Sequence, residues 1–264
     1  MKFEPVQPVR PVAAWQGGKR KLAKRLVARI NEIEHDSYVE PFVGMGGVFL
    51  RRDRRPPCEV INDWSEDVST LFRVIQHHFV AFTEMIRFQI TSRANFEKLV
   101  ATDPSTLTDL QRSARFLYIQ KLAFGGTVIG RNFGTSPGLA PRFDVTKVVP
   151  MIEALHERLA SVTIERLPWQ KLIARWDRPG TLFYLDPPYH GSERDYGDGM
   201  FGRAEFAEMA AVLANIQGKF IMSINDHPEI RELFAAFTIE EADVIYTVGG
   251  QAKAKTVREL IITG

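Results

Sequence analysis

Two stretches of alternating strand and helix patterns, one near each end of the chain, most restrict the folds that this sequence can adopt. The first contains a helical pattern over residues 18–31 and short strand patterns that end near Glu40 and Asp63. The second predicts strands at 181–185, 219–224, 244–248 and 257–262, and helices at 203–216 and 228–237. Residues 66–165 between them are mostly helical in pattern. Because strands that alternate with helices favour a largely parallel sheet, we predict an α/β fold with residues 1–65 and 166–264 in one domain and 66–165 inserted.

The second stretch opens with an apolar strand pattern that ends in Asp186-Pro187-Pro188-Tyr189. Each proline fixes its own φ and biases the preceding residue toward extended geometry, so the backbone carbonyls there point in set directions. Asp186 and the Pro187 carbonyl can accept hydrogen bonds, and Tyr189 offers a flat face. This set suits a planar group with an exocyclic amine, such as an adenine held out of a helix. The alternative is a strand that stops at a Pro-Pro turn.

A glycine-rich turn, residues 40–47, follows the first strand pattern. Its glycines permit close approach of the backbone to a ligand, although the spacing is not a full G-x-G-x-x-G. Asp63 follows Gly46 by 17 residues, near the spacing at which an acid binds ribose hydroxyls. Its other interpretation is an acid at a helix N-terminus. Upstream, residues 15–19 (Trp-Gln-Gly-Gly-Lys) place an aromatic, two glycines and a cation before the first helix.

Basic residues form three clusters, although the formal net charge is only +2. They lie in residues 1–30, where eight cations face one acid, in residues 51–55, and at Lys253, Lys255 and Arg258. One such cluster can be an ordinary solvated face. Three on one chain favour a polyanionic partner, because Lys and Arg supply phosphate contacts.

The cysteine content and the hydropathy exclude several classes. The lone Cys58 excludes an internal disulfide framework and a multi-cysteine metal site, and no metal is implied. No apolar run reaches the length of a membrane span, and the N-terminus lacks an apolar signal core. We therefore expect a cytoplasmic protein with no membrane partner.

The order of these segments resembles that of the Dam-type (D12 class) DNA adenine-N6 methyltransferases. The resemblance is carried by residues 15–19, 40–47, 186–189, 220–225 and the terminal strand pattern 257–262, and it extends from about residue 12 to the end. It implies a Rossmann-like S-adenosylmethionine-dependent methyltransferase sheet with an inserted helical target-recognition domain that carries a hairpin. The activity implied is site-specific methylation of N6 of adenine in duplex DNA.

The resemblance also implies where S-adenosylmethionine binds. The residues implied are Trp15, Gly17, Gly18 and Lys19 on the methionine side, Glu40, Pro41, Phe42, Gly44 and Gly46 at the strand end, Asp63 on the ribose, and Asp186. The chain departs from the family where many members clamp the cofactor adenine with Asp and an aromatic, because Pro168-Trp169 stands there. Trp169 could still stack on the adenine, but the amine-accepting Asp is missing.

By the same resemblance, Asp186, Pro187, Pro188 and Tyr189 are the catalytic residues. The N6 amine of adenine is a poor nucleophile because its lone pair is delocalised into the ring. Hydrogen bonds from it to Asp186 and to the Pro187 carbonyl would make the nitrogen more nucleophilic and stabilise the charge that develops on it. Tyr189 would stack on the base, which is first flipped out at a cost of roughly a few kcal/mol.

The helical insertion is the expected DNA-binding part, and double-stranded DNA the expected partner. Its glycine-rich residues 125–134 predict a hairpin or a long loop. Arg131 and Asn132 at the tip are suited to guanine and adenine edges in the major groove, or belong to a flexible polar loop. We expect a bacterial or phage-encoded, nucleoid-associated enzyme that acts as a monomer or as a dimer on DNA.

Two other functions stay open at this point. One is methyl transfer to RNA or to a protein amide nitrogen, which similar Pro-Pro-Tyr sites support. The other is a DNA-binding homologue with weakened catalysis, for which the missing clamp Asp is the only argument. The sequence does not fix the recognition site, a partner restriction endonuclease, or a phage or chromosomal origin.

Overall fold

A mostly parallel sheet forms the centre of the molecule in a computed structural model that describes residues 3–135, 138, 140–193, 201–247 and 254–264. Val248 and Lys253, used in the sequence patterns, lie outside these residues. Within them, seven strands pair in the order β5-β4-β2-β6-β7-β9-β8, and only the pairs that involve β9 are antiparallel. The strands are β2 (Ser37–Glu40), β4 (Cys58–Asn62), β5 (Thr163–Glu165), β6 (Thr181–Leu185), β7 (Lys219–Asn225), β8 (Thr238–Thr247) and β9 (Ala254–Thr263). The predicted α/β fold is confirmed.

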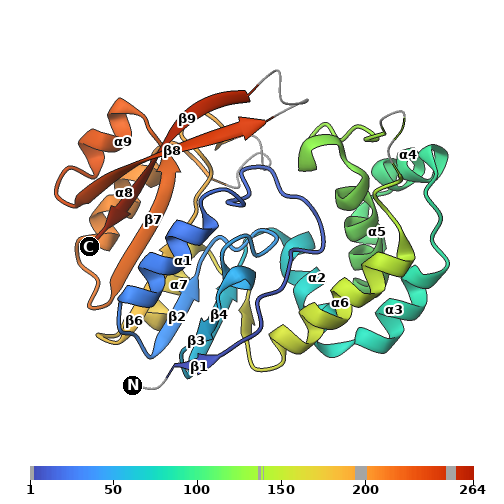
Figure 1. Cartoon of the computed structure of the whole chain (residues 1–264), viewed down its shortest axis with the longest axis horizontal. Helices are drawn as coiled ribbons and strands as arrows, with labels where there is room; N and C mark the ends of the chain where they lie inside the picture. The colour runs from blue at the N-terminus through green and yellow to red at the C-terminus, as the bar shows by residue number, and fades with distance from the viewer. Residues whose placement is uncertain (1–2, 136–137, 139, 194–200, 248–253) are drawn as a thin grey trace.

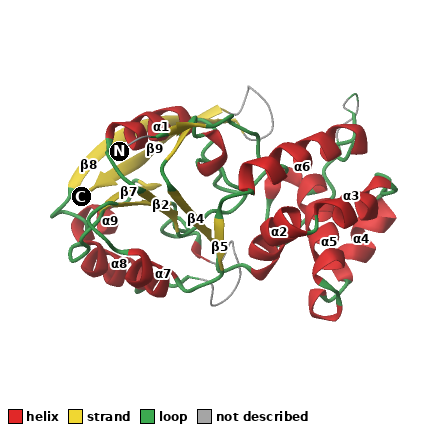
Figure 2. Ribbon diagram, turned by 90° about the horizontal axis from the view of Figure 1, so that it is seen from below, coloured by secondary structure: helices red, strands yellow, loops and turns green. Residues whose placement is uncertain are grey.

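Alternate side chains of the strands enter two apolar clusters on opposite faces of the sheet. Every residue of β6 is buried, with Leu182 and Tyr184 in one cluster and Phe183 and Leu185 in the other. A strand covered by helices on both faces requires this period of two. The covering helices are α1 (Ala23–Glu32) on the first face, and α7 (Trp169–Trp176), α8 (Glu205–Leu213) and α9 (Pro228–Leu233) on the second (Figure 2). Among the described helices, none has the length and apolarity that crossing a membrane requires.

The helices between β4 and β5 lie together beside the sheet (Figure 1). They are α2 (Glu66–His77), α3 (Phe79–Arg87), α4 (Arg93–Ala101), α5 (Asp109–Leu122) and α6 (Val145–Leu159), with a 3-10 turn, η2, at Pro104–Thr106. α2 packs on α3, α5 and α6, and α5 packs on α3 and α4. Phe72, Leu117 and Ile152 of these helices belong to the same buried cluster as Tyr38 and Leu182 of the sheet. The helices and the sheet thus share one hydrophobic core.

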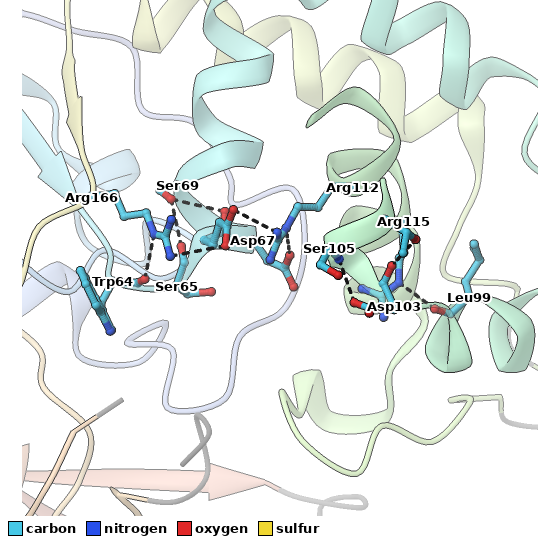
Figure 3. A network of polar contacts seen from close by, with 12 residues as sticks. Trp64, Ser65, Asp67, Ser69, Leu99, Asp103, Ser105, Arg112, Arg115 and Arg166 are labelled. Atoms are coloured by element: carbon cyan, nitrogen blue, oxygen red, sulfur yellow. Dashed lines mark hydrogen bonds and ion pairs between the residues drawn. The ribbon is translucent and has the colours of Figure 1, made fainter. Parts of the chain in front are cut away.

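Ion pairs at the first turn of α2 join the sheet to these helices (Figure 3). Arg112 of α5 lies 2.6 Å from Asp67 and 3.1 Å from Glu66. Arg166, which follows β5, lies 3.4 Å from Glu66 and donates to the backbone carbonyl of Trp64. Acids at this end also interact favourably with the helix dipole. The start of α2 is therefore held from both sides.

The glycine-rich loop after α5 differs from a regular hairpin. In the described part of the loop, one antiparallel bridge joins Ala123 to Phe133. Beside it, the Phe124 N–H donates to the Asn132 carbonyl at 2.9 Å. The chain then forms a 3-10 turn, η3 (Phe124–Gly126), instead of further paired residues. Of the two predicted forms, a long loop fits this segment better than a hairpin.

Small elements near the N-terminus complete the fold. The strands β1 (Glu4–Pro5) and β3 (Arg54–Arg55) form an antiparallel pair, and the 3-10 turn η1 (Phe49–Arg51) follows the glycine turn. The segment between β1 and α1, dark blue in Figure 1, runs up the side of the sheet that faces the helices and returns over its top to α1. α1 begins at Ala23 and not at residue 18, because the chain first forms turns at 16–17, where Gly17 has a φ of +71°, and at 20–22.

Candidate active site

The carboxyl ends of β2 and β6 form the point at which the connections of the sheet change direction. The chain runs from β2 outward to β4 and β5, and then returns to β6 on the other side of β2. Ligands of open α/β sheets bind in the crevice at such a switch point. Here a cavity of about 960 Å³ is lined by Glu40, the last residue of β2, and by Asp186, directly after β6.

The glycine turn after β2 makes close contact with the first motif. Gly44 has a φ of +49°, and a Cβ there would lie 2.6 Å from Nε1 of Trp15. The Gly44 N–H also donates to Oδ2 of Asp63 at 2.9 Å. Only glycine suits this position, because an L side chain would be strained by the φ and would collide with the indole. Three separate sequence segments therefore meet at Gly44, and all three line the cavity.

Asp63 is held by backbone donors at the end of β4. Its Oδ2 accepts from Gly44, and its Oδ1 accepts from the N–H of Ser65 at 2.9 Å. Burial raises the pKa of Asp63 to about 6, against the effect of these two bonds. Asp63 thus supports the start of α2 and also borders the cavity. The structure accommodates both interpretations of this acid, since each oxygen has a second lone pair.

Lys19 lies at the centre of a buried polar cluster behind the cavity. The residue is 2% exposed, and its Nζ lies 2.8 Å from Oδ1 of Asp186 and 3.5 Å from Oε2 of Glu259. Nζ also donates to the Tyr189 hydroxyl at 2.5 Å. A buried ammonium requires such partners, because desolvation without them is costly. The first motif is thereby joined to the corner after β6 and to the last strand.

Asp186 combines a raised pKa with a specific set of neighbours. Burial raises its pKa to about 6, while the charge and hydrogen bond of Lys19 oppose the rise. The Ser223 hydroxyl, from β7, lies 3.4 Å from the same Oδ1 and is hydrogen-bonded to the Tyr184 hydroxyl at 2.7 Å. At neutral pH Asp186 is therefore mostly ionised and able to accept a hydrogen bond.

The backbone after Tyr189 is fixed by Asn225 at the end of β7. The Asn225 side chain accepts from the His190 N–H at 2.9 Å and donates to the His190 carbonyl at 3.1 Å. The His190 ring stacks on His227 with centroids 3.8 Å apart. A two-point amide contact of this kind restricts the Pro-Pro-Tyr segment to one path.

Glu40 is a buried acid at the bottom of the cavity. It is 2% exposed and accepts a hydrogen bond from the Tyr38 hydroxyl at 2.8 Å. Burial raises its pKa to about 8, with the negative charge of Asp186 contributing. Glu40 is therefore mostly protonated at pH 7, and its carboxyl group can donate as well as accept.

Comparison with known proteins decides the class of this site. Residues 15–248 match the D12 class of N6 adenine-specific DNA methyltransferases, a range that contains the glycine turn and the corner after β6. The chain belongs to this class. As a member, it is a DNA adenine methyltransferase, and it therefore acts on DNA and uses a methyl donor. The enzyme class predicted from the sequence is confirmed.

Named relatives of the D12-class enzyme agree with this assignment. The type II methyltransferase M.CviBI of Paramecium bursaria Chlorella virus NC1A is 21% identical over 90% of this chain and 91% of its own length. A DNA adenine methylase of Haemophilus influenzae is 23% identical over 96% of this chain and 92% of its own length. The retron Ec67 DNA adenine methylase of Escherichia coli is 24% identical, with 95% and 90% covered.

The D12-class enzyme brings most of the predicted cofactor residues to one cavity. The predicted residues in its lining are Trp15, Gly18, Lys19, Glu40, Phe42, Gly44, Asp63, Asp186 and Pro188. The other predicted residues of these motifs are next to them in sequence but not in the lining, namely Gly17, Pro41, Gly46, Pro187 and Tyr189. Ser223 and Glu259, which the sequence argument did not select, contact this set from β7 and β9.

Trp169 lies in the core of the enzyme and not in the lining of this cavity. It is the first residue of α7, is 4% exposed and packs in the second apolar cluster. Its indole N–H donates to Glu205 of α8 at 2.7 Å. Two other rings, Phe42 and Phe201, do line the cavity and meet edge to face with centroids 6.0 Å apart. The structure thus gives Trp169 a packing role between two helices.

Arg131 lies within the glycine-rich loop rather than pointing from its tip. Its guanidinium donates to the side chain of Gln120 at 3.2 Å and to the Thr127 carbonyl at 3.4 Å, and it lies over the ring of Phe116. Burial lowers its pKa. Asn132 is exposed, and its side-chain amide donates to the Gly130 carbonyl at 3.1 Å.

Proposed function

We propose that this enzyme transfers the methyl group of S-adenosylmethionine to N6 of an adenine flipped out of duplex DNA at a specific sequence. One observation carries the proposal, namely the state of the Asp186 carboxylate. Its Oδ1 faces Lys19 and Ser223, whereas none of the described residues donates to its Oδ2. A carboxylate that lines the cavity and has one oxygen still able to accept a hydrogen bond suits an exocyclic amine.

The cavity fits S-adenosylmethionine as the donor. Its volume lies in the range of cofactor sites, and its lining includes the Asp63 and Asp186 carboxylates, which complement a cation. When bound, the cofactor supplies an already activated methyl group. Trp15 and Gly44 would hold its methionine side, and Asp63 its ribose. The other residues implied by the family resemblance at the first motif and at the strand end would support them.

The residues after β6 would act by alignment and electrostatics. Asp186 and the Pro187 carbonyl would accept hydrogen bonds from N6, which favours a nucleophilic nitrogen and stabilises its developing charge. Tyr189 would stack on the target base, and Lys19 would hold both Tyr189 and Asp186 in place. Asn225 would keep this segment from moving as the base enters.

Residues 66–165 would select the DNA sequence. Three of their elements, α6, α5 and the loop after α5, contribute Met151, Lys121 and Val128 to the cavity lining. We propose that Asn132 reads a base edge and that Arg131 holds the loop in the shape that reading requires. The enzyme would act on DNA of a bacterial or phage genome, as a monomer.

Mapping of modified bases tests the proposal. The protein is expressed in a methylation-deficient bacterial host, and single-molecule sequencing locates N6-methyladenine in the DNA. We expect modification at one short sequence, and none with the Asp186→Ala variant as the matched control. If no adenine in DNA is modified while labelled methyl enters RNA in vitro, the DNA function is wrong.

A further inference from the structure

A group of arginines lines one part of the cavity that the proposed chemistry does not use. Arg10 comes from the segment after β1, Arg20 from the turn before α1, and Arg51 from η1. Burial lowers the pKa of Arg51, and the charges of Arg20 and Arg10 lower it further. Three separate segments thus place like charges on the wall of one cavity.

These arginines have no acidic partners among the described residues. Within the described part of the chain none of them forms an ion pair, and Arg51 donates a hydrogen bond to the Gly47 carbonyl. Lys121 and Arg142, which also line the cavity, are instead occupied by the carbonyls of Val12 and Ala123 at 2.8 and 3.1 Å. Arg51 is half-buried whereas Arg10 and Arg20 are exposed, so an anion at the cavity wall can reach all three and offset their mutual repulsion.

We propose that Arg10, Arg20 and Arg51 together bind a phosphate of the DNA strand that inserts its adenine into the cavity, one of the two that flank the target nucleotide. The inference rests on the proposed function, because a base at Asp186 brings its own phosphates to the same cavity. Guanidinium groups suit this ligand, since they bind phosphate oxygens with paired hydrogen bonds and stay charged when partly buried. The Gly47 carbonyl fixes the Arg51 side chain beside the glycine turn, so the phosphate and the cofactor would be placed relative to each other.

The test compares a triple variant, Arg10→Gln, Arg20→Gln and Arg51→Gln, with Arg54→Gln. Arg54 is an exposed arginine of β3 that lies outside the cavity lining, so Arg54→Gln measures the effect of one general charge, and three times that effect is the reference for the triple variant. DNA affinity is measured by fluorescence anisotropy over a range of salt concentrations, and cofactor affinity by calorimetry. We expect the triple variant to lose DNA affinity about tenfold or more and to show a shallower salt dependence, by about one unit of slope per lost contact. Cofactor affinity should stay within about twofold, as expected when sites do not share a ligand.

A neutral phosphate analogue locates the contact. In a duplex with the mapped target, a methylphosphonate replaces each phosphate beside the target adenosine in turn. One of the two replacements should lower the DNA affinity of the wild type about tenfold. It should lower the DNA affinity of the triple variant far less, because the arginines that bind this phosphate are already absent. Equal losses in both proteins would overturn the assignment, as would wild-type DNA affinity in the triple variant.

The outcomes separate this inference from the proposed function. A triple variant that binds DNA normally but binds the cofactor weakly would assign the arginines to the cofactor and overturn the phosphate site. A wild type that produces N6-methyladenine, together with an unaffected triple variant, would overturn the phosphate site alone. A wild type that neither binds nor modifies DNA would overturn both proposals.

Discussion

The ammonium of Lys19 lies 2.8 Å from Oδ1 of Asp186, in a cluster that also contains Glu259 at 3.5 Å. One buried cation therefore contacts two carboxylates, one directly after β6 and one within β9. Its charge opposes the rise in the Asp186 pKa that burial causes. The first motif thus contributes to the electrostatics of the corner after β6, in addition to bordering the cavity.

Removal of the Asp186 carboxylate should abolish methyl transfer without removing the cofactor site. In Asp186→Ala we expect the single-turnover rate to fall by about a hundredfold or more, since an electrostatic acceptor in an active site has this magnitude. The measurements are incorporation of labelled methyl into DNA and calorimetric titration with the cofactor. Undiminished turnover in the variant would show that another group accepts the amine.

The rate should fall in acid with the protonation of Asp186. Its pKa is raised to about 6, and the ionised form is both the stronger acceptor for N6 and the form whose charge stabilises the positive charge developing there. We therefore expect kcat/KM for DNA at saturating cofactor to fall by about tenfold per pH unit below pH 6. The pKa of Asp63 is also raised to about 6, so its protonation would alter cofactor affinity. Measuring at saturating cofactor removes that contribution from the pH profile.

Replacement of Lys19 supplies a control for that pH profile. Lys19→Met removes the charge that lowers the Asp186 pKa, so the acid limb should move to higher pH. Circular dichroism verifies that the variant is folded. A limb at an unchanged pH would assign the titration to a group other than Asp186.

Glu40 should make the wild type less stable as the pH rises. Burial raises its pKa from 4.5 to about 8, so the folded chain keeps a proton that the unfolded chain releases. The free energy of unfolding should therefore decrease across this pH interval, and Glu40→Gln, which cannot ionise, should lack this decrease. By urea denaturation at pH 6.5 and 8, we expect the difference between the two proteins to change by about 1 kcal/mol or more. If the free energies of unfolding of the wild type and Glu40→Gln changed in parallel with pH, Glu40 would not be the group that titrates.

An alanine at Gly44 should damage the cavity, whereas one at Gly47 should be tolerated. The Gly44→Ala side chain would meet the Trp15 indole at 2.6 Å and would sit at a φ of +49°. At Gly47 the nearest atom is the Lys19 nitrogen at 3.4 Å. We expect the Gly44 variant to bind the cofactor about tenfold or more weakly and to melt at a lower temperature. Equal affinities of the two variants would show that the indole can move aside.

The loop after α5 can be tested through Arg131. In Arg131→Ala the hydrogen bond to Oε1 of Gln120 is lost. That bond helps to orient the Gln120 amide, whose Nε2 donates to the carbonyls of Ala14 and Gly126. We expect a relaxed or lost sequence choice in maps of N6-methyladenine. Arg87→Ala, an exposed change on α3, should leave the map unaltered. An unchanged map in the Arg131 variant would place recognition elsewhere.

Local patterns predicted the strands next to the cavity, because a strand buried on both faces appears in the sequence as a short continuous apolar run. The run at 181–185 coincides with β6, whose residues are all buried. β8 begins earlier than its pattern, since Glu240, Glu241 and Asp243 interrupt the apolar alternation of an edge strand. α7 was not predicted, and Trp169 was assigned to the cofactor because a motif has no information about burial.

The contacts across the site could not be predicted, because they join residues that are distant in sequence. Glu259 nevertheless leaves a signal, since an acid stands inside the apolar pattern of the last strand. A charged residue is almost never fully buried without a partner. The sequence therefore indicates that Glu259 has a polar partner, without identifying it. The partner, Lys19, lies 240 positions away in the sequence, and only the folded chain brings its Nζ to 3.5 Å from Glu259.

The common hydrophobic core of the sheet and helices α2–α6 has a consequence for how such an enzyme acquires a new target. Phe72, Leu117 and Ile152 pack in the same cluster as the strands, so these helices cannot be exchanged as an independent module without repacking the interior. A chimera that grafts them from a distant relative should misfold. New specificities are expected to evolve by point changes in exposed loop residues such as Asn132, a route that leaves the interior intact.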